Sequence, residues 1–425
     1  MINNGSLTSI ISAFFKTITE EKEPRKDLRK RQRSRVCRIE QLEERELLSV
    51  STGDFDAIKS QYEDLNLGNF ADYNIIEVGG AGDQAGGVNN NFDFTDAGIR
   101  AAIARAEQTT DNDLIVVRTT SAQNKITLGG TQLEISINSI SYGSVTIVSL
   151  GSENLTIDAN KQSRVLSVSH GTVALGGLTV TRGQASGSGA GIYYGANDTL
   201  TVTNCTISEN NITSSSSNYG GGIYYGTSGT LTVTNSTIIG NTAMVGGGIY
   251  SSNFSKLTVI NSTIFKNSGD GVGCGDSGTL TMTGSMVSEN SRYGVYGGTS
   301  STLTVMDSTI SGNNTGGIYS NGSLTVMNST LFGNTFGGYG GGIYSGGGIY
   351  STLTIINSTI SGNTAYWNGG GIYIHSDGTL TVSNSTISGN ISGGIFSGSG
   401  GTFNKSLFAS SPNRRLKPKS VYGLI

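Results

Sequence analysis

The sequence is poor in charged residues, and this scarcity limits the kinds of partner it can recognise through charge. Asp, Glu, Lys and Arg make up 13% of the 425 residues, against about 25% in a typical soluble domain. The formal net charge is only −3, and nine of the 27 Lys and Arg residues fall within residues 22–38. This basic segment has no interleaved aromatic residues, so we expect no nucleic-acid partner.

Proline and paired cysteines are also scarce. The chain has three prolines, and none lies between Pro24 and Pro412. Because proline cannot donate a backbone hydrogen bond, its absence is what a long, continuous ladder of strands requires. The three cysteines, Cys37, Cys205 and Cys274, follow no metal-ligand or disulfide spacing, and we expect them to be unpaired.

Long apolar runs are missing. No run of about 18 apolar residues occurs, so the sequence predicts no transmembrane segment. The short apolar stretch over residues 7–15 has its positive charge after it rather than before it, which makes it a poor secretory signal.

What the sequence has in abundance is a repeat. From Leu200 onward, a phrase similar to Leu-Thr-Val-x-Asn-Ser-Thr-Ile-x-x-Asn occurs eight times, and its copies begin 21 to 31 residues apart. This is the length of one solenoid coil, with insertions in some coils. A second phrase, ending in Gly-Ile-Tyr or a variant, lies between the copies, so each coil has at least two strands. The first leucines are Leu200, Leu231, Leu257, Leu280, Leu303, Leu324, Leu353 and Leu380.

The first phrase alternates apolar and polar residues with the period of a β-strand. Its Leu and Val should therefore face the interior, and its Thr should face the solvent. The repeat is too short to hold a helix between successive parallel strands, so the coils must stack directly on one another. The predicted fold is all-β, a right-handed parallel β-helix.

Each copy of the first phrase ends in asparagine. Asn tolerates left-handed backbone conformations and bonds neighbouring backbone groups, so it can turn a corner and stack as an amide ladder. A second near-column, interrupted at Gly284, precedes it, and we expect a structural role for both. The first column is Asn210, Asn241, Asn267, Asn290, Asn313, Asn334, Asn363 and Asn390, and the second is Asn204, Asn235, Asn261, Asp307, Asn328, Asn357 and Asn384.

Upstream of the regular repeat, residues 114–181 contain less regular strand patterns that we interpret as earlier coils. Before them, an amphipathic helix is predicted with Thr95 or Asp96 as its N-cap. Such a helix would cover the open end of the solenoid. Its apolar face is Ile99, Ala102, Ile103 and Ala106. The predicted organisation is a basic leader over residues 1–50, a poorly defined linker over 51–94, the β-helix over 95–405 with regular coils from about 200, and a tail over 406–425.

The paired phrases, one Gly-rich and ending in Gly-Ile and the other of the form Ser-x-x-x-Ser/Gly-x-Asn, resemble the repeats of chlamydial-type polymorphic outer membrane proteins and related bacterial β-helix surface proteins. The resemblance covers residues 95–400 and implies surface display and adhesion, with a polysaccharide or a cell-surface component as partner. Nothing in the sequence sets an oligomeric state.

The segment IEQLEERELLSV (Ile39–Val50), with the basic run before it, resembles the N-terminal motif of large exported proteins of planctomycete-type bacteria. This resemblance implies that residues 1–50 are an export leader and that the protein is extracellular or at the cell surface. The alternative interpretation is a short charged helix.

An enzyme is the alternative hypothesis, because the same fold carries polysaccharide lyases and hydrolases. A pectate-lyase-like enzyme needs stacked carboxylates that hold Ca²⁺ beside an Arg or Lys base, and a hydrolase needs paired carboxylates. Outside the lyase hypothesis we expect no cofactor and no metal. Any catalytic site should lie where charge is concentrated over two to three adjacent coils, in a patch made of Lys256, Lys266, Asp270, Asp276, Glu289 and Arg292.

Tyrosines form a further column. In successive coils a tyrosine follows Gly-Ile or Gly-Val, one residue beyond an inward position, and should therefore face outward. Either the rings pack on one another and shield the corner, or they form an amphipathic stripe on which a glycan or a partner protein lies. These residues are Tyr193, Tyr224, Tyr250, Tyr296, Tyr319, Tyr344 and Tyr373.

Overall fold

The computed structural model describes residues 50–79, 91–137, 143–195, 197–214, 219–346, 351–375, 377–399 and 402–410. Residues 1–49, with Cys37 and almost all of the predicted leader, lie outside the described residues, as do residues 411–425 of the predicted tail. The description below concerns the unit that begins at Val50.

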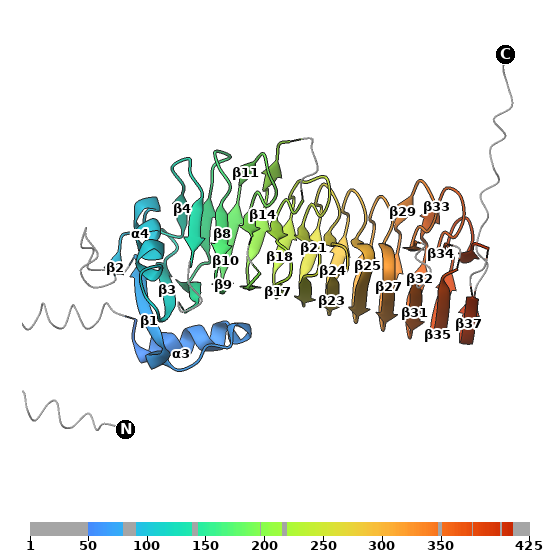
Figure 1. Ribbon diagram of the computed structural model, residues 1–425, viewed down its shortest axis with the longest axis horizontal. Helices are drawn as coiled ribbons and strands as arrows, with labels where there is room; N and C mark the ends of the chain where they lie inside the picture. The colour runs from blue at the N-terminus through green and yellow to red at the C-terminus, as the bar shows by residue number, and fades with distance from the viewer. Residues whose placement is uncertain are drawn as a thin grey trace, which may run out of the picture. The chain divides into compact units, whose positions relative to one another are not determined.

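The strands of this unit wind into a solenoid in which every ladder is parallel (Figure 1). Each regular coil contributes three strands. In one coil these are β17 (Thr230–Thr234), β18 (Thr237–Ile239) and β19 (Ile249–Ser251), and each pairs with its counterpart in the next coil. The repeat predicted at least two strands per coil, and the third is the short Thr-Ile strand that follows the left-handed turn.

We name the three ladders by their repeated phrases. The Leu-Thr-Val ladder contains β1 (Tyr73–Val78), β3 (Asn112–Thr119), β6 (Val145–Gly151), β9 (Val173–Gly176), β13 (Thr199–Thr203), β17, β20 (Lys256–Ile260), β23 (Thr279–Thr283), β25 (Val295–Met306), β27 (Ile318–Met327), β31 (Thr352–Ile356), β35 (Thr379–Ser388) and β37 (Thr402–Ser410). The Thr-Ile ladder contains β4 (Lys125–Thr127), β7 (Leu155–Asp158), β10 (Leu178–Thr181), β14 (Thr206–Ser208), β18, β21 (Thr263–Phe265), β24 (Met286–Ser288), β26 (Thr309–Ser311), β28 (Thr330–Phe332), β32 (Thr359–Ser361) and the second half of β35.

The Gly-Ile-Tyr ladder contains β5 (Leu133–Ser136), β8 (Leu166–His170), β12 (Ile192–Tyr194), β16 (Ile223–Tyr225), β19, β22 (Val272–Cys274), the first residues of β25 and β27, β30 (Ile343–Ser345), β34 (Ile372–Ile374) and β36 (Ile395–Ser397). Shorter strands complete the set: β2 (Asn91–Phe92) pairs with β1, β11 (Gln184–Ala185) with β15 (Asn211–Ile212), and β29 (Thr335–Phe336) with β33 (Thr364–Ala365).

The core consists of identical positions stacked in register. Val233 lies between Val202 and Val259 of the neighbouring coils, and all three are fully buried. Thr232, one residue earlier, is partly exposed. The predicted inward and outward faces of the strand are therefore confirmed, and the inward columns join into one continuous core.

The two asparagine columns have different roles. In the first, the Asn241 amide nitrogen donates to Oδ1 of Asn267 at 3.1 Å and to the Ile207 carbonyl at 2.9 Å, which confirms the predicted amide ladder. The ladder is buried, and its residues do not adopt the left-handed conformation that was expected of them at the corner. The second column supplies the left-handed turn, because Asn235 and its equivalents have φ values of 48° to 51°. Gly284, which interrupts this column in the sequence, adopts the same conformation with φ 60°.

A second buried polar ladder, made mainly of serines, was not predicted. The Ser236 backbone N–H donates to Oγ of Ser262 at 3.1 Å, while the Ser236 hydroxyl donates to the Thr234 carbonyl at 2.7 Å. Cys205 takes the first position of this ladder, and its N–H donates to Oγ of Ser236 at 3.1 Å. Cys205 and Cys274 are free, as predicted, and burial raises the pKa of each thiol to about 12. The other members are Ser285, Ser308, Ser329, Ser358 and Ser385.

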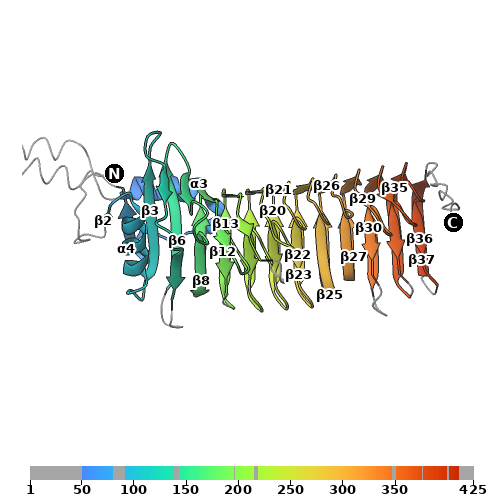
Figure 2. The ribbon, with the colours of Figure 1, turned by 90° about the horizontal axis from the view of Figure 1, so that it is seen from above.

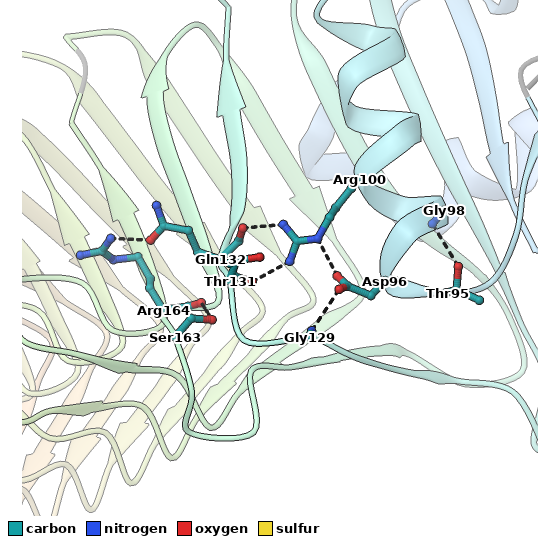
Figure 3. A network of polar contacts seen from close by, with 9 residues as sticks. All are labelled: Thr95, Asp96, Gly98, Arg100, Gly129, Thr131, Gln132, Ser163 and Arg164. Atoms are coloured by element: carbon teal, nitrogen blue, oxygen red, sulfur yellow. Dashed lines mark hydrogen bonds and ion pairs between the residues drawn. The ribbon is translucent and has the colours of Figure 1, made fainter. Parts of the chain in front are cut away.

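The predicted capping helix is α4 (Asp96–Ala106), which lies at the N-terminal end of the stack (Figure 2). Its predicted apolar face is buried in the solenoid core. Thr95 is the N-cap, and its hydroxyl accepts the Gly98 N–H at 3.0 Å. The Arg100 guanidinium lies 2.8 Å from the Asp96 carboxylate and donates to the carbonyl of Gln132 at 2.7 Å (Figure 3). These bonds hold the helix on the first coils.

The segment 51–94, for which the pattern predicted no defined element, contains α3 (Thr52–Gln61), η1 (Glu63–Leu65), η2 (Phe70–Asp72) and β1. A capping box between Ser51 and Asp54 starts α3. Because β1 pairs with β3, the first ladder strand begins at Tyr73 rather than near residue 95. Among the described residues, neither α-helix is long and apolar enough to span a bilayer.

Helix α3 covers the outer face of the first coils. Ile58 and Phe55 of α3 pack in a second core with Leu114 and Val148, which point away from the solenoid interior. The Tyr62 hydroxyl donates to the Ser149 carbonyl at 2.8 Å. Strand β3 is therefore buried on both faces, which explains why its sequence is continuously apolar rather than alternating.

Candidate functional site

The structure distributes the predicted charged patch over different corners of the coils. Lys266 follows β21, Asp270 lies in the loop before β22, and Asp276 lies between β22 and β23. Lys256 is exposed at the start of β20. Stacking brings only two pairs of the six residues into ionic contact among the described residues.

The first pair is Asp270 with Arg292. Asp270 is fully buried, and its Oδ2 lies 3.5 Å from Nη1 of Arg292 in the next coil. The backbone N–H groups of Gly246 and Tyr293 donate to the carboxylate at 3.2 and 3.1 Å, and Arg292 donates to the Met244 carbonyl at 2.6 Å. Burial raises the pKa of Asp270 against the opposing effects of Arg292 and these hydrogen bonds. The pair thus ties three consecutive loops together.

The second pair is weak. Nζ of Lys266 and a carboxylate oxygen of Glu289 are 3.8 Å apart, and both side chains are about 60% exposed. An exposed pair of this kind contributes between about 0 and 1 kcal/mol. Asp276, in another corner, accepts the Thr299 N–H at 2.7 Å. Within the described ranges, no group of three or more His, Cys, Asp and Glu side chains could hold a metal ion.

The predicted tyrosines stack in two runs separated by one coil. Tyr319 lies between Tyr296 and Tyr344, with ring centroids 5.3 and 5.0 Å apart. The other run joins Tyr193 to Tyr224 at 5.3 Å and Tyr224 to Tyr250 at 6.2 Å. The coil between the runs has Gly273 at this position, and the Tyr250 ring occupies the space that a side chain there would need. Tyr373 and Phe396 continue the run that begins at Tyr296, with centroid distances of 5.2 Å from Tyr344 to Tyr373 and 5.4 Å from Tyr373 to Phe396.

This stacking determines what the tyrosine column can present. Neighbouring rings within the runs are parallel to within 11°. Both faces of an interior ring are therefore occupied by its neighbours, and only the ring edge with its hydroxyl points outward. A ligand can bond to the hydroxyl groups of the column, but no flat ligand can lie on an interior ring face.

An arginine occupies the ring face at the N-terminal end of the column. The Arg164 guanidinium lies 4.9 Å from the centroid of the Tyr193 ring. It donates to Oε1 of Gln132 at 2.7 Å (Figure 3), and to the carbonyls of Gly189 and Ser188 at 2.7 and 3.0 Å. These fixed bonds make Arg164 a structural cap on the column.

A second aromatic layer, missed by the sequence analysis, covers parts of the column. It comes from the loops between the asparagine ladder and the Gly-Ile-Tyr ladder. Tyr219 lies 4.5 Å from Tyr250, and Tyr339 lies 4.6 Å from Tyr373, in each case on the tyrosine of the following coil. The sequence did contain a pattern that could have predicted these two tyrosines, since the phrase Tyr-Gly-Gly-Gly-Ile-Tyr occurs at residues 219–224 and 339–344. Outermost in this layer are Tyr366 and Trp367, at 67% and 57% exposure.

A charged cluster in the irregular coils was also missed. Asp158 is buried between Lys125, at 2.5 Å, and Arg182, one coil to either side. Burial by itself would raise the pKa of Asp158, but hydrogen bonds from Arg182, Lys125 and the Asn160 N–H lower it to about 2. The cluster has one carboxylate between two cations, so it forms a clamp rather than a pair of acids. Without a regular repeat there is no register that predicts it.

The comparison with protein families agrees with the architecture. A family model described as right handed beta helix region matches residues 176–331 and 247–408. Among solved structures, the crystal structure of pectate lyase Pel9A is similar, with 16% sequence identity over 80% of this chain and 79% of that chain, and a TM-score of 0.34. The search of curated proteins found no match. Because the family model covers more than half of the chain, the protein belongs to the right-handed β-helix family.

Proposed function

We propose that the protein is an exported or cell-surface β-helix scaffold, similar to adhesins, that presents a repetitive Thr, Asn and Tyr face to its partner. The observation that carries the proposal is the outward threonine column of the Leu-Thr-Val ladder. Its members stay in register and partly exposed over eight coils. They are Thr201, Thr232, Thr258, Thr281, Thr304, Thr325, Thr354 and Thr381.

Two further features support a surface role. The column offers the same hydroxyl group once per coil, and the stacked tyrosines offer a second row, so a repetitive partner could bind in many equivalent positions. The resemblance of the coils to polymorphic outer membrane protein repeats, and of Ile39–Val50 to an export motif, supports display outside the cell. The partner we propose is a polysaccharide or another cell-surface component.

Localisation and binding can be tested on the full chain. Antibody labelling and protease treatment of intact cells should detect the protein at the surface or in the medium. The purified protein should be retained on at least one member of a panel of acidic polysaccharides, neutral polysaccharides and cell surfaces. Protein found only inside the cell would contradict the surface role. Binding to none of the panel members would contradict the adhesin-like role.

A carbohydrate-active enzyme of the pectate-lyase or hydrolase type is the second candidate, favoured by the contact between Asp270 and Arg292. The contact brings together a carboxyl group and a guanidinium, the two residue types that the enzyme hypothesis requires in one place. The same panel should be assayed for unsaturated or reducing chain ends, with and without Ca²⁺. New chain ends would favour the enzyme. Activity that survives alanine replacement of Asp270, Asp276 and Arg292 would exclude the charged patch as its site.

A further inference from the structure

Three aromatic side chains form an exposed cluster on two neighbouring loops, and we call Tyr339, Tyr366 and Trp367 the aromatic patch. Tyr339 is 36% exposed, and the other two are more than half exposed. The ring centroids of Tyr339 and Trp367 are 6.0 Å apart with planes at 29°, and Tyr366 meets Trp367 edge-on at 5.4 Å. The interior tyrosines of the column have both ring faces covered, whereas these three side chains remain exposed to solvent.

The two loops hold the patch in place. Strands β29 and β33 pair across them, the Trp367 N–H donates to the Gly338 carbonyl at 3.1 Å, and the Tyr366 N–H donates to the Phe336 carbonyl at 3.0 Å. Tyr339 rests on Tyr373 of the column beneath. A ligand that binds the patch therefore finds the rings already positioned, which reduces the entropy lost on binding.

Loop lengths place the patch on a raised part of the solenoid. The loops that carry it have seven residues each (335–341 and 364–370), whereas the loops on either side have three (314–316 and 391–393). A partner that approaches this corner meets the longer loops first. The longer loops therefore give the patch room to project beyond the loops of the adjacent coils.

The surroundings of the patch are uncharged. From Ser308 to Ser376 the sequence contains no Asp, Glu, Lys or Arg. A polyanion, such as an acidic polysaccharide or a nucleic acid, needs cationic partners that this stretch does not supply. A protein partner is also a poor fit, because a stable protein interface buries about 1,600 Å² in total and three rings cover far less.

An uncharged sugar polymer fits these properties. A pyranose ring has a flat face of C–H groups that packs on an aromatic face, and hydroxyl groups at its edge that bond to amides and hydroxyls. Tyr and Trp combine an apolar ring with a polar group, and the loops add Asn368 and threonines beside them. We propose that the aromatic patch binds the sugar rings of a neutral polysaccharide. This proposal deepens the surface function proposed above, on which it rests, by naming the ligand class.

The chain supplies its own probe, because Trp367 is its only tryptophan. The full-length protein should be titrated with cellohexaose while tryptophan emission is recorded, and with oligogalacturonate of the same length as the acidic comparison. We expect a saturable shift in emission with cellohexaose and none with oligogalacturonate. The Tyr366→Ala variant should weaken cellohexaose binding by about tenfold, because it removes one of the three rings.

A second readout does not depend on the fluorophore. Retention of the protein in gels that contain a neutral β-glucan should be lost in Trp367→Ala and partly kept in Trp367→Phe, which retains an aromatic face. Phe254→Ala is the matched control, because Phe254 is 67% exposed but lies in another corner, between β19 and β20. Unchanged retention of Trp367→Ala, an equal loss in Phe254→Ala, or tighter binding of oligogalacturonate would overturn the proposal.

The outcomes separate the two proposals. A protein displayed at the surface that shows no Trp367-dependent binding of either glucan would contradict the neutral-polysaccharide site alone. A protein that binds glucan through Trp367 but stays inside the cell would contradict the surface function alone.

Discussion

The irregular N-terminal coils and the regular coils from residue 200 stabilise the same solenoid by different means. In the first region, α3 covers outward apolar side chains, and buried carboxylates bind cations from neighbouring coils, as Asp158 does with Lys125 and Arg182. In the second region, the outward positions of the Leu-Thr-Val ladder are threonines, and the polar groups that recur in the core are the neutral asparagine and serine ladders. The buried Asp270, which contacts Arg292 and lies in a loop, is a charged exception in this region.

The difference has a physical cause. In a regular repeat each side chain lies against a copy of itself in the next coil, and a charge at such a position would face a like charge. Asn and Ser avoid this problem because each carries both a donor and an acceptor, so identical residues can bond in an endless row. Irregular coils place different residues side by side, so opposite charges can pair. The low charge of the chain is therefore a consequence of its repetition.

The largest effect is expected for a charge placed inside the regular stack. Val233→Asp puts an unpaired carboxylate between Val202 and Val259, and we expect it to lower the free energy of unfolding by about 4 kcal/mol or more. Thr232→Asp, which points outward, should cost less than about 1 kcal/mol. Urea unfolding followed by circular dichroism measures both. Equal effects would mean that the strand register is wrong.

The second-largest effect is expected when the packing of α3 on the first coils is weakened. Ile58 is fully buried in α3, and Ile58→Ala should cost about 3 kcal/mol through the cavity it leaves. Hydrogen exchange should show faster opening of β3 and β6, while β25 and β27 keep their protection, because coils interact mainly with their neighbours. Ile310→Ala, in a regular coil, is the control and should affect β24 and β28 instead. Uniform loss of protection over all coils in the Ile58 variant would refute this division.

A smaller loss is expected from one break in the amide ladder. Asn290 accepts two hydrogen bonds from Asn267 and donates to Asn313 and to the Ile264 carbonyl. Asn290→Ala leaves buried partners unsatisfied, and we expect a cost of between about 2 and 3 kcal/mol in the same unfolding assay. Asn357→Gly serves as the comparison, since its left-handed turn position accepts glycine, and it should change stability by less than about 0.5 kcal/mol.

The smallest expected effect is the pH dependence that comes from Asp158, in the irregular coils. The pKa of Asp158 is lowered from 3.8 to about 2 in the folded protein. A lowered carboxyl pKa contributes stability that is present above pH 3.8 and is lost as the pH falls toward 2, and the shift corresponds to about 2 kcal/mol. Between pH 5 and pH 2, the free energy of unfolding measured in urea should therefore fall more for the wild-type protein than for Asp158→Asn. Parallel curves for the two proteins would show that the clamp contributes nothing.

The sequence predicted the features that depend on position within the repeat. Alternation placed Val233 inside and Thr232 outside, the recurring asparagine predicted the amide ladder, and the apolar face of residues 96–106 predicted the capping helix. Features that depend on contacts between unlike segments were not predictable in this way. The cover formed by α3, and the clamp of Lys125 and Arg182 on Asp158, join residues whose separations in sequence follow no common period.

The candidate sites divide along the same line. The sequence identified the tyrosine column, because its members share one position in each coil, but it left open whether their ring faces were free. Only the tertiary structure decided this, because the spacing of the coils brings consecutive rings into parallel contact and leaves their faces occupied. It also separated the charged residues of the 256–292 patch, which are near in sequence but lie at different corners of the coil. Sequence by itself therefore determined the fold and its columns, since a repeat specifies which residues stack. The tertiary structure decided which surfaces remain available, since exposure depends on loops that do not repeat.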